Sequence, residues 1–282
     1  MADPPRGGSC MHKGVGWVTF WSNIPRMKLV PHVPRSGGDA TSQTERVVVA
    51  LREMLLRGDF RPGERLAELT LVPRLKASRT PVRLALDRLA HEGLIEALPA
   101  GGFKVREFAL ADIWDAIEIR GVLEGTAARF AAERLERRDE LARLQLCCRQ
   151  VEELLPMNLD NFVRYLEVND AFHVELWRLA KSPMLVRTIE SLISLPFAAP
   201  SALVFTNAEV NGSSPMGSVA LEHYRSIVEA IANREGTRAE ALAREHARVG
   251  RRNLASALKD RTLFNQVPGA SLLRLSVPMD AL

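Results

Sequence analysis

Apolar residues recur at intervals of three and four along most of the chain, which is the spacing of amphipathic helices. After Gly93 this pattern gives way to short apolar stretches bounded by turn residues, which are typical of strands. Three helices and then two strands are predicted in the N-terminal part, at 41–57, 66–75, 76–93, 94–98 and 103–106. A Pro-Ala-Gly-Gly turn joins the strands. This order of elements predicts a winged helix-turn-helix.

The second part of the chain has helical spacing that is interrupted mainly by short polar links. Six helices are predicted, at 112–135, 138–155, 159–180, 184–195, 219–233 and 237–259, with a loop at 199–214. Because most links are short, these helices are expected to form an antiparallel bundle. The predicted fold class is therefore mainly α, with an N-terminal winged helix-turn-helix followed by an all-α antiparallel helical bundle.

Both ends of the chain differ from this pattern. Residues 1–40 are rich in proline and glycine and are expected to be a disordered leader, in which Met27 offers an alternative start. Residues 260–282 have mixed polarity, and no element is predicted in this C-terminal tail. The expected division is a leader at 1–40, a winged domain at 41–107, a helical domain at 111–259 and a tail at 260–282.

Composition narrows the class of protein only slightly. The 282 residues are 46% hydrophobic, with a net charge of +4 and a pI near 9.2, which is compatible with nucleic acid as a partner. The three cysteines, Cys10, Cys147 and Cys148, fit no disulfide framework and indicate a cytoplasmic setting. The apolar run at 15–21 is too short for a signal or membrane segment. We therefore expect no membrane partner.

The segment KASRTPVRLALDR at 76–88 predicts a helix that can enter a DNA groove. Thr80 is expected to be its N-cap, with Pro81 at the first helical position. Between positions 74 and 88 the basic residues outnumber the single acidic one, and they are Arg74, Lys76, Arg79, Arg83 and Arg88. Such a cluster binds phosphates and reads guanine edges. The alternative is an amphipathic surface helix with solvated arginines.

Polar residues with metal-binding chemistry lie on inward faces of the predicted bundle. Asn169 and His173 are four residues apart, and His246 lies on the inner stripe of the last helix. Two ligands at this spacing suit a single metal ion, and His223 or Tyr224 would complete the set. The alternative is that each histidine is a hydrogen-bonded residue of the core.

The N-terminal part resembles the GntR family of bacterial transcription regulators. The resemblance rests on GDFRPGERLAE, LVPRLKASRTPVRLALDRLAHEGLIE and GGFKV, in this order. It implies that Ser78, Arg79, Thr80 and Arg83 contact operator DNA and that a wing glycine, Gly101 or Gly102, approaches it. The chain departs from the family pattern at Pro73, Lys76 (a glycine in most members) and Leu84 (a glutamate in most members).

The helical part resembles the FCD effector domain of FadR-type GntR regulators. The resemblance rests on AIEIRGVLEGTAARFAA, NDAFHVELWRLAKSPML and EHYRSIVEAIANREGTRAEALAREHA. It implies a divalent metal ion (zinc, nickel or manganese) held by Asn169, His173, His246 and a fourth ligand. It also implies a small carboxylate effector near Arg120.

Two of these positions have open alternatives. The family pattern puts the fourth ligand at the position of Tyr224, and His223 lies one residue, or about 100°, away from it. Either a local bulge turns His223 inward, which we expect, or Tyr224 occupies the pocket and weakens or abolishes metal binding. Arg120 either binds the effector carboxylate or forms an i, i+4 ion pair with Glu124.

The expected function is that of a homodimeric, DNA-binding transcriptional regulator, with a small organic acid relieving repression. The first alternative is a DNA-binding regulator with a degenerate, metal-free bundle. The second is a metal-dependent enzyme that acts on small carboxylates, but no general base or nucleophile is evident beside the metal ligands. The sequence therefore does not predict an enzyme.

Overall fold

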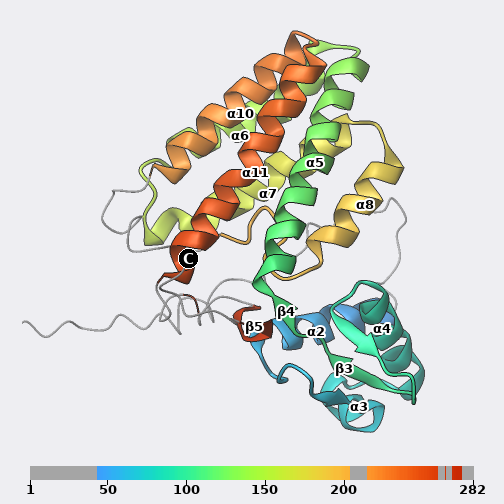
Figure 1. Ribbon diagram of the computed structural model, residues 1–282. Helices are drawn as coiled ribbons and strands as arrows, with labels where there is room; N and C mark the ends of the chain where they lie inside the picture. Colours follow the sequence, from blue (N-terminus) through green and yellow to red (C-terminus); the bar gives the residue numbers. More distant parts are fainter. Residues whose placement is uncertain (1–42, 204–214, 260–263, 265–268, 275–282) are drawn as a thin grey trace, which may run out of the picture.

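A computed structural model describes residues 43–203, 215–259, 264 and 269–274. Figure 1 shows a helical bundle above a smaller domain that combines helices with short strands. The predicted leader and most of the predicted tail lie outside the described residues, as does part of the predicted loop at 199–214. None of the described helices is both long enough and apolar enough to cross a membrane.

The small domain has the predicted order of three helices and a hairpin. Its helices are α2 (Gln43–Arg57), α3 (Glu68–Leu75) and α4 (Arg79–His91), and its strands are β1 (Arg65–Leu66), β2 (Ile95–Ala97) and β3 (Phe103–Val105). The strands form an antiparallel sheet in the order β1-β3-β2. The fold class is confirmed, but strand β1 was not predicted, and it includes Leu66, which was assigned to a helix.

The start of α4 differs from the prediction. Ser78 has an extended backbone and is the N-cap, so the prediction of Thr80 at this position was wrong. Pro81 is the third helical residue, where its missing N–H still costs no intrahelical hydrogen bond. Lys76 ends α3 in the left-handed conformation, with φ of 48°, which glycine adopts more easily and which agrees with the turn glycine that the resemblance implies at this position. The turn geometry is kept at a cost of about 1–2 kcal/mol.

The bundle contains the six predicted helices within the described residues. They are α5 (Leu110–Arg134), α6 (Ala142–Glu153), α7 (Leu159–Leu179), α8 (Pro183–Ile193), α10 (Met216–Ala232) and α11 (Gly236–Leu258). Residues Arg138–Leu141, predicted as part of a helix, form the separate 3-10 turn η1. Val122 of α5 and Leu146 of α6 are large apolar residues, and both are exposed.

Helices α5 and α11 approach each other closely because α5 carries two glycines at this contact (Figure 1). A Cβ atom on Gly125 would lie 2.9 Å from the carbonyl oxygen of Glu240, and one on Gly121 would lie 3.0 Å from Cβ of Ala247. Larger residues would therefore force the helices apart. The close approach brings the polar side chains of both helices into the same region of the bundle.

The C-terminal tail, for which no element was predicted, returns to the winged domain. Strand β5 (Leu273–Arg274) pairs in parallel with β4 (Phe108–Ala109), in the segment predicted to be only a linker. The 3-10 turn η2 (Ala270–Leu272) precedes β5. The backbone N–H of Gly269 donates to the carbonyl of Leu56 at the end of α2, with N and O 2.6 Å apart. The tail therefore ties the winged domain to the junction between the domains.

One apolar core extends across both domains. It contains the winged-domain core together with residues of α5, α11 and the tail, namely Ile113, Ile117, Leu254, Ala257, Leu258, Phe264, Ala270 and Leu272. Such burial is the main stabilising contribution to packing, at about 25 cal/mol per Å² of apolar surface. The winged domain is therefore held against the bundle by a hydrophobic contact rather than by a free linker.

Residues 194–203, which we term the connecting segment, run between the two cores as a series of buried turns. Phe197 belongs to the shared core and stacks on Phe264, with ring centroids 5.6 Å apart. Leu203 belongs to the bundle core, and Ala202 packs against both. The φ angle of Phe197 is 58°, which is strained for a large side chain. The connecting segment thus contacts both domains.

Replacing a buried tail residue should destabilise the whole chain. Leu272 is fully buried, and Leu272→Ala is expected to lower the free energy of unfolding by about 2–5 kcal/mol, as for other buried leucines. Arg274→Ala is the control because this side chain is exposed, and it should change the stability by less than about 0.5 kcal/mol. Denaturant unfolding would measure the free energy of unfolding of both variants. If the two substitutions change it equally, the tail does not have the proposed stabilising role.

Candidate functional site

The four predicted DNA-contacting side chains lie together at the start of α4. Ser78, Arg79, Thr80 and Arg83 are all exposed there. The Arg83 side chain is 71% exposed, and its nearest acidic partner, Glu68, is 4.0 Å away. Exposed pairs at this distance contribute little. The helix start therefore presents two arginines and two hydroxyl groups that are available to a DNA groove.

The tip of the wing requires glycine for its backbone conformation. Gly101 and Gly102 have φ angles of +89° and +87°, which other residues rarely adopt. Both are exposed, and among the described residues no atom comes within 4 Å of where their Cβ atoms would lie. Hydrogen bonds between Gly101, Gly102 and Leu98 close the turn. The tip is thus shaped to let its backbone approach another molecule.

Two of the five basic residues predicted to bind DNA are engaged inside the winged domain. Arg88 forms ion pairs of 3.1 Å with both Glu45 and Glu92. Arg74 lies 3.7 Å from Asp59 and over the ring of Phe60. These contacts connect the helices of the domain to each other. Arg88 in particular stabilises the domain rather than facing solvent freely. The positive surface at the start of α4 is therefore smaller than the sequence indicated.

A cluster of polar side chains occupies the interior of the bundle, where four helices meet. We term it the polar site, and its members are Arg120 and Glu124 of α5, Asn169, Asp170 and His173 of α7, Tyr224 of α10 and His246 of α11. Six of the seven are at least 93% buried, and Asp170 is partly buried. Buried polar groups are costly unless they are paired, so this cluster needs a reason to be there.

His173 is oriented by Glu124, which the sequence offered only as an alternative ion-pair partner of Arg120. Its Nδ1 lies 2.8 Å from Oε1 of Glu124, which also accepts a hydrogen bond from Nε1 of Trp177 at 3.3 Å. Burial opposes ionisation of Glu124, but the charges of His173 and Arg120 and these hydrogen bonds outweigh it and lower its pKa. Nδ1 of His173 therefore carries the proton, and Nε2 faces the interior.

His246 faces His173 across the polar site. The two Nε2 atoms are 3.3 Å apart, and the rings are tilted by 31°. Burial, together with the nearby charges of His173, His223 and Arg120, holds the pKa of His246 well below its usual value, so this ring is neutral. Its Nδ1 is buried, with no hydrogen-bond partner in the described part of the chain.

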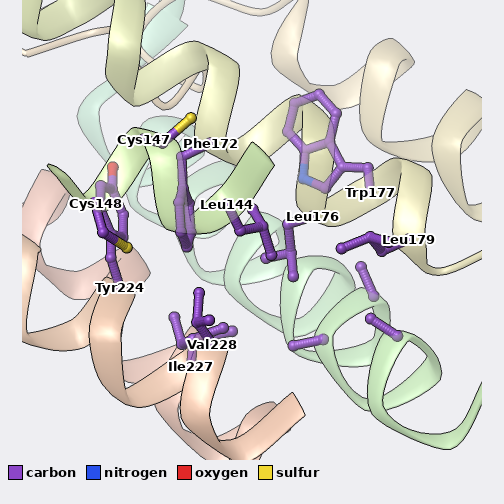
Figure 2. Close-up of a cluster of buried hydrophobic side chains, with 14 of the residues drawn as sticks. Leu144, Cys147, Cys148, Phe172, Leu176, Trp177, Leu179, Tyr224, Ile227 and Val228 are labelled. Atoms are coloured by element: carbon purple, nitrogen blue, oxygen red, sulfur yellow. The ribbon is translucent and has the colours of Figure 1, made fainter. Parts of the chain in front are cut away.

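Tyr224, rather than His223, occupies the pocket. Its ring is fully buried and stacks on Phe172, with centroids 3.7 Å apart, within the apolar cluster drawn in Figure 2. Its hydroxyl donates to Oδ1 of Asn169 at 2.7 Å. Helix α10 runs without interruption from Met216 to Ala232, so the bulge expected to turn His223 inward is not formed. His223 is half-buried and lies edge-on to His246.

The residues present do not fit a divalent metal ion. The 3.3 Å between the two Nε2 atoms matches two nitrogen ligands of a tetrahedral zinc at about 2.0–2.1 Å each. However, Tyr224 engages the oxygen of Asn169, and burial raises the pKa of Tyr224 well above 10, which keeps it a neutral phenol. In the described ranges no three His, Cys, Asp or Glu side chains are placed to hold a metal.

Arg120 is a buried cation with free hydrogen-bond donors. Its side chain is 4% exposed, and its Nε and Nη1 have no partner among the described residues. The alternative ion pair with Glu124 is not formed within 4.0 Å: Oε1 of Glu124 binds His173 and Trp177, and Oε2 has no partner among the described residues. A Cβ atom on Gly250 would lie 3.3 Å from Nη2 of Arg120, so the glycine provides room for the guanidinium.

Asp170 belongs to the polar site but was not predicted from the sequence. Burial raises its pKa to about 6, although hydrogen bonds from Ser201 and the charges of His173 and Arg120 lower it. Its Oδ1 is buried and unpartnered within the described residues. The signal was present in the motif Asn-Asp-Ala-Phe-His, but a helical pattern turns adjacent residues about 100° apart, which favoured Asn169.

Comparison with known proteins agrees with both parts of this architecture. The chain matches the family model for bacterial regulatory proteins of the gntR family over residues 43–105 and the model for the FCD domain over residues 115–249. A solved structure of a putative GntR transcriptional regulator from Rhodococcus sp. RHA1 has a TM-score of 0.50 and 22% identity. The match covers 77% of this chain and 99% of that one, and it indicates a shared fold.

Two curated relatives illustrate the degree of similarity. The Nta operon transcriptional regulator of Aminobacter aminovorans is 34% identical over 47% of this chain and 61% of its own length. The transcriptional regulator McbR of Escherichia coli K12 is 31% identical over 54% of this chain and 67% of its own length. Both relatives are regulators rather than enzymes. The chain belongs to the GntR family of DNA-binding transcriptional regulators, in the FadR-like group with a C-terminal FCD domain.

Proposed function

We propose that this regulator is controlled by a small organic acid whose carboxylate binds Arg120 in the polar site. The observation that carries the proposal is the buried guanidinium with two unpartnered nitrogens. An unpaired buried cation is strongly unfavourable, and a carboxylate would satisfy it with charge-assisted hydrogen bonds. The ligand would enter without a resident metal ion, because the donor set described above does not fit one.

The regulator would act on DNA as a homodimer. One recognition helix addresses one half-site, and near-palindromic operators need two of them at a fixed spacing. Ser78, Arg79, Thr80 and Arg83 would contact the operator, with Gly101 and Gly102 at the wing. Repression that the acid relieves is the proposed direction of control.

The connecting segment supplies a route between the two sites. Ser201 binds Asp170 of the polar site through its hydroxyl and backbone N–H, and Leu203 packs near Gly250 beside Arg120. Phe197, four residues before Ser201, lies in the core shared with the winged domain. A ligand that moves Asp170 would thus move a segment on which the winged domain rests. Control requires that the ligand bind the two arrangements with different affinity.

Loss of either exposed arginine should weaken operator binding. If each makes a bidentate base contact, Arg79→Ala and Arg83→Ala should each cost about 1–3 kcal/mol of binding free energy. Fluorescence anisotropy on operator fragments selected in vitro by the wild-type protein would measure this. Arg187→Ala, an exposed arginine on α8 in the bundle, is the matched control. If all three variants bind alike, the two residues have no recognition role.

Replacing Arg120 should abolish the response to organic acids. A panel of simple, hydroxy, dicarboxylic and amino acids would be screened for those that raise the melting temperature of the wild-type protein. Arg120→Ala is expected to lose this increase, and Arg120→Lys to retain a smaller part of it, since lysine keeps the charge but not the bidentate geometry. If an acid raises the melting temperature of Arg120→Ala by as much as that of the wild type, its carboxylate does not bind Arg120.

Elemental analysis tests the metal-free reading of the site. FCD domains can bind metals, yet the wild-type protein is expected to retain no stoichiometric zinc, nickel or manganese after incubation and dialysis. Tyr224→His adds a third imidazole beside His173 and His246, and it should give up to one zinc per chain. Tyr224→Phe removes only the hydroxyl and should bind none. One metal ion per wild-type chain would show that the donor set is sufficient.

A further inference from the structure

The polar site contains unpartnered acceptors as well as unpartnered donors. Arg120 leaves Nε and Nη1 free, and two carboxylates each leave one oxygen free, namely Oδ1 of Asp170 and Oε2 of Glu124. All four atoms are buried. Unsatisfied groups of opposite kind within one site indicate a ligand that carries both an acceptor group and a donor group.

These groups do not neutralise each other directly. Within the described residues no ion pair of 4.0 Å or less joins Arg120 to Glu124 or to Asp170. Glu124 is held by His173 and Trp177, and Asp170 is held by Ser201. Each carboxylate is thus fixed by one oxygen while the other oxygen is left open. The site thus offers unpartnered donors on Arg120 and unpartnered acceptors on Asp170 and Glu124.

The balance of charge selects among organic acids. The site holds one guanidinium and two carboxylates, and His246 is neutral. His173 is engaged by Oε1 of Glu124, so among the described residues the open oxygens of Glu124 and Asp170 face no cation of their own within hydrogen-bond distance. A plain carboxylate would pair with Arg120 but leave the open oxygen of each carboxylate unpartnered, and a dicarboxylate would add a further negative charge beside them. A ligand with an ammonium group places a positive charge at the open oxygens, where burial makes such pairing most valuable.

We propose that the effector is a small zwitterion, an amino acid or related amino-carboxylic acid, with its carboxylate on Arg120 and its ammonium on Oδ1 of Asp170. Oε2 of Glu124 is the second acceptor for the ammonium. This inference rests on the proposed function, since it needs an effector carboxylate at Arg120. The specificity-determining residue, Asp170 of α7, would then also contact the connecting segment, through its hydrogen bonds with Ser201.

The test compares acids that share one carbon skeleton and differ in one substituent. L-Alanine, L-lactate and propionate form one series, and L-norvaline, 2-hydroxyvalerate and valerate form another. The twenty amino acids are screened first by thermal shift, and each one that binds is compared with its own hydroxy and unsubstituted acids by calorimetry. The amino acid is expected to bind at least tenfold more tightly than either counterpart on the wild-type protein.

The variant Asp170→Asn should then change the two kinds of ligand in opposite directions. It removes the charge that attracts an ammonium group, so binding of the amino acid should fall at least tenfold. It also removes a repulsion, so binding of the unsubstituted acid should stay the same or improve. Glu167→Gln, an exposed residue one turn earlier on α7, is the control and should change neither.

Three outcomes distinguish the possible failures. If hydroxy or unsubstituted acids bind as tightly as the amino acids, or if acids bind but no amino acid does, the zwitterion is excluded while a carboxylate effector at Arg120 stands. If no acid of any kind binds, the proposed function fails and this inference fails with it. If Asp170→Asn does not fold, the comparison of the three kinds of acid on the wild-type protein still tests whether the effector is a zwitterion.

Discussion

The close approach of α5 and α11 is the contact on which the architecture depends. Gly121 and Gly125 let the two longest described helices come together with no side chain between them on the α5 side. This contact sets Arg120 and Glu124 beside His246 and Gly250, and it directs both helices toward the winged domain. Ile113 and Ile117 near the start of one helix and Leu254 and Leu258 near the end of the other then enter the shared core.

The same contact explains why a polar cluster is tolerated inside the bundle. Four helices that meet closely can each contribute one to three polar side chains, some of which form hydrogen bonds with one another. Asn169 with Tyr224 and His173 with Glu124 form short hydrogen bonds of 2.7 and 2.8 Å. The buried atoms left without a partner among the described residues include charged groups of Arg120, Glu124 and Asp170, and unpaired buried charges are typical of a binding site rather than of a purely structural network.

Much of the fold followed from periodicity, because long helices and a hairpin have strong local patterns. The elements that were missed are those whose formation depends on distant partners. Strand β1 has two residues and exists only because β3 lies beside it, and β5 exists only because it pairs with β4, more than 160 residues earlier. The N-cap at Ser78 rather than Thr80 is a smaller error, since both residues can accept a backbone hydrogen bond.

The site was predictable in its location and less so in its chemistry. Helical spacing placed Asn169, His173 and His246 inward, and the stripe through Tyr224 already pointed to the pocket better than His223 did. The helical spacing does not show which polar side chains pair with each other across different helices. The sequence offered Glu124 only as a possible partner of Arg120 on its own helix, whereas in the structure Glu124 pairs with His173 on α7. Asp170 became visible only through Ser201, which lies 31 positions further along the chain.

The return of the tail to the winged domain also affects how the protein is made. The core of that domain includes Leu254, Leu258, Phe264 and Leu272, which are synthesised long after its last strand at Val105. At roughly 5–20 residues per second, the ribosome needs on the order of ten seconds to reach them. During this time Leu56 and Phe108 lack part of their apolar cover. The nascent chain therefore completes its DNA-binding part last, although that part is encoded before the bundle.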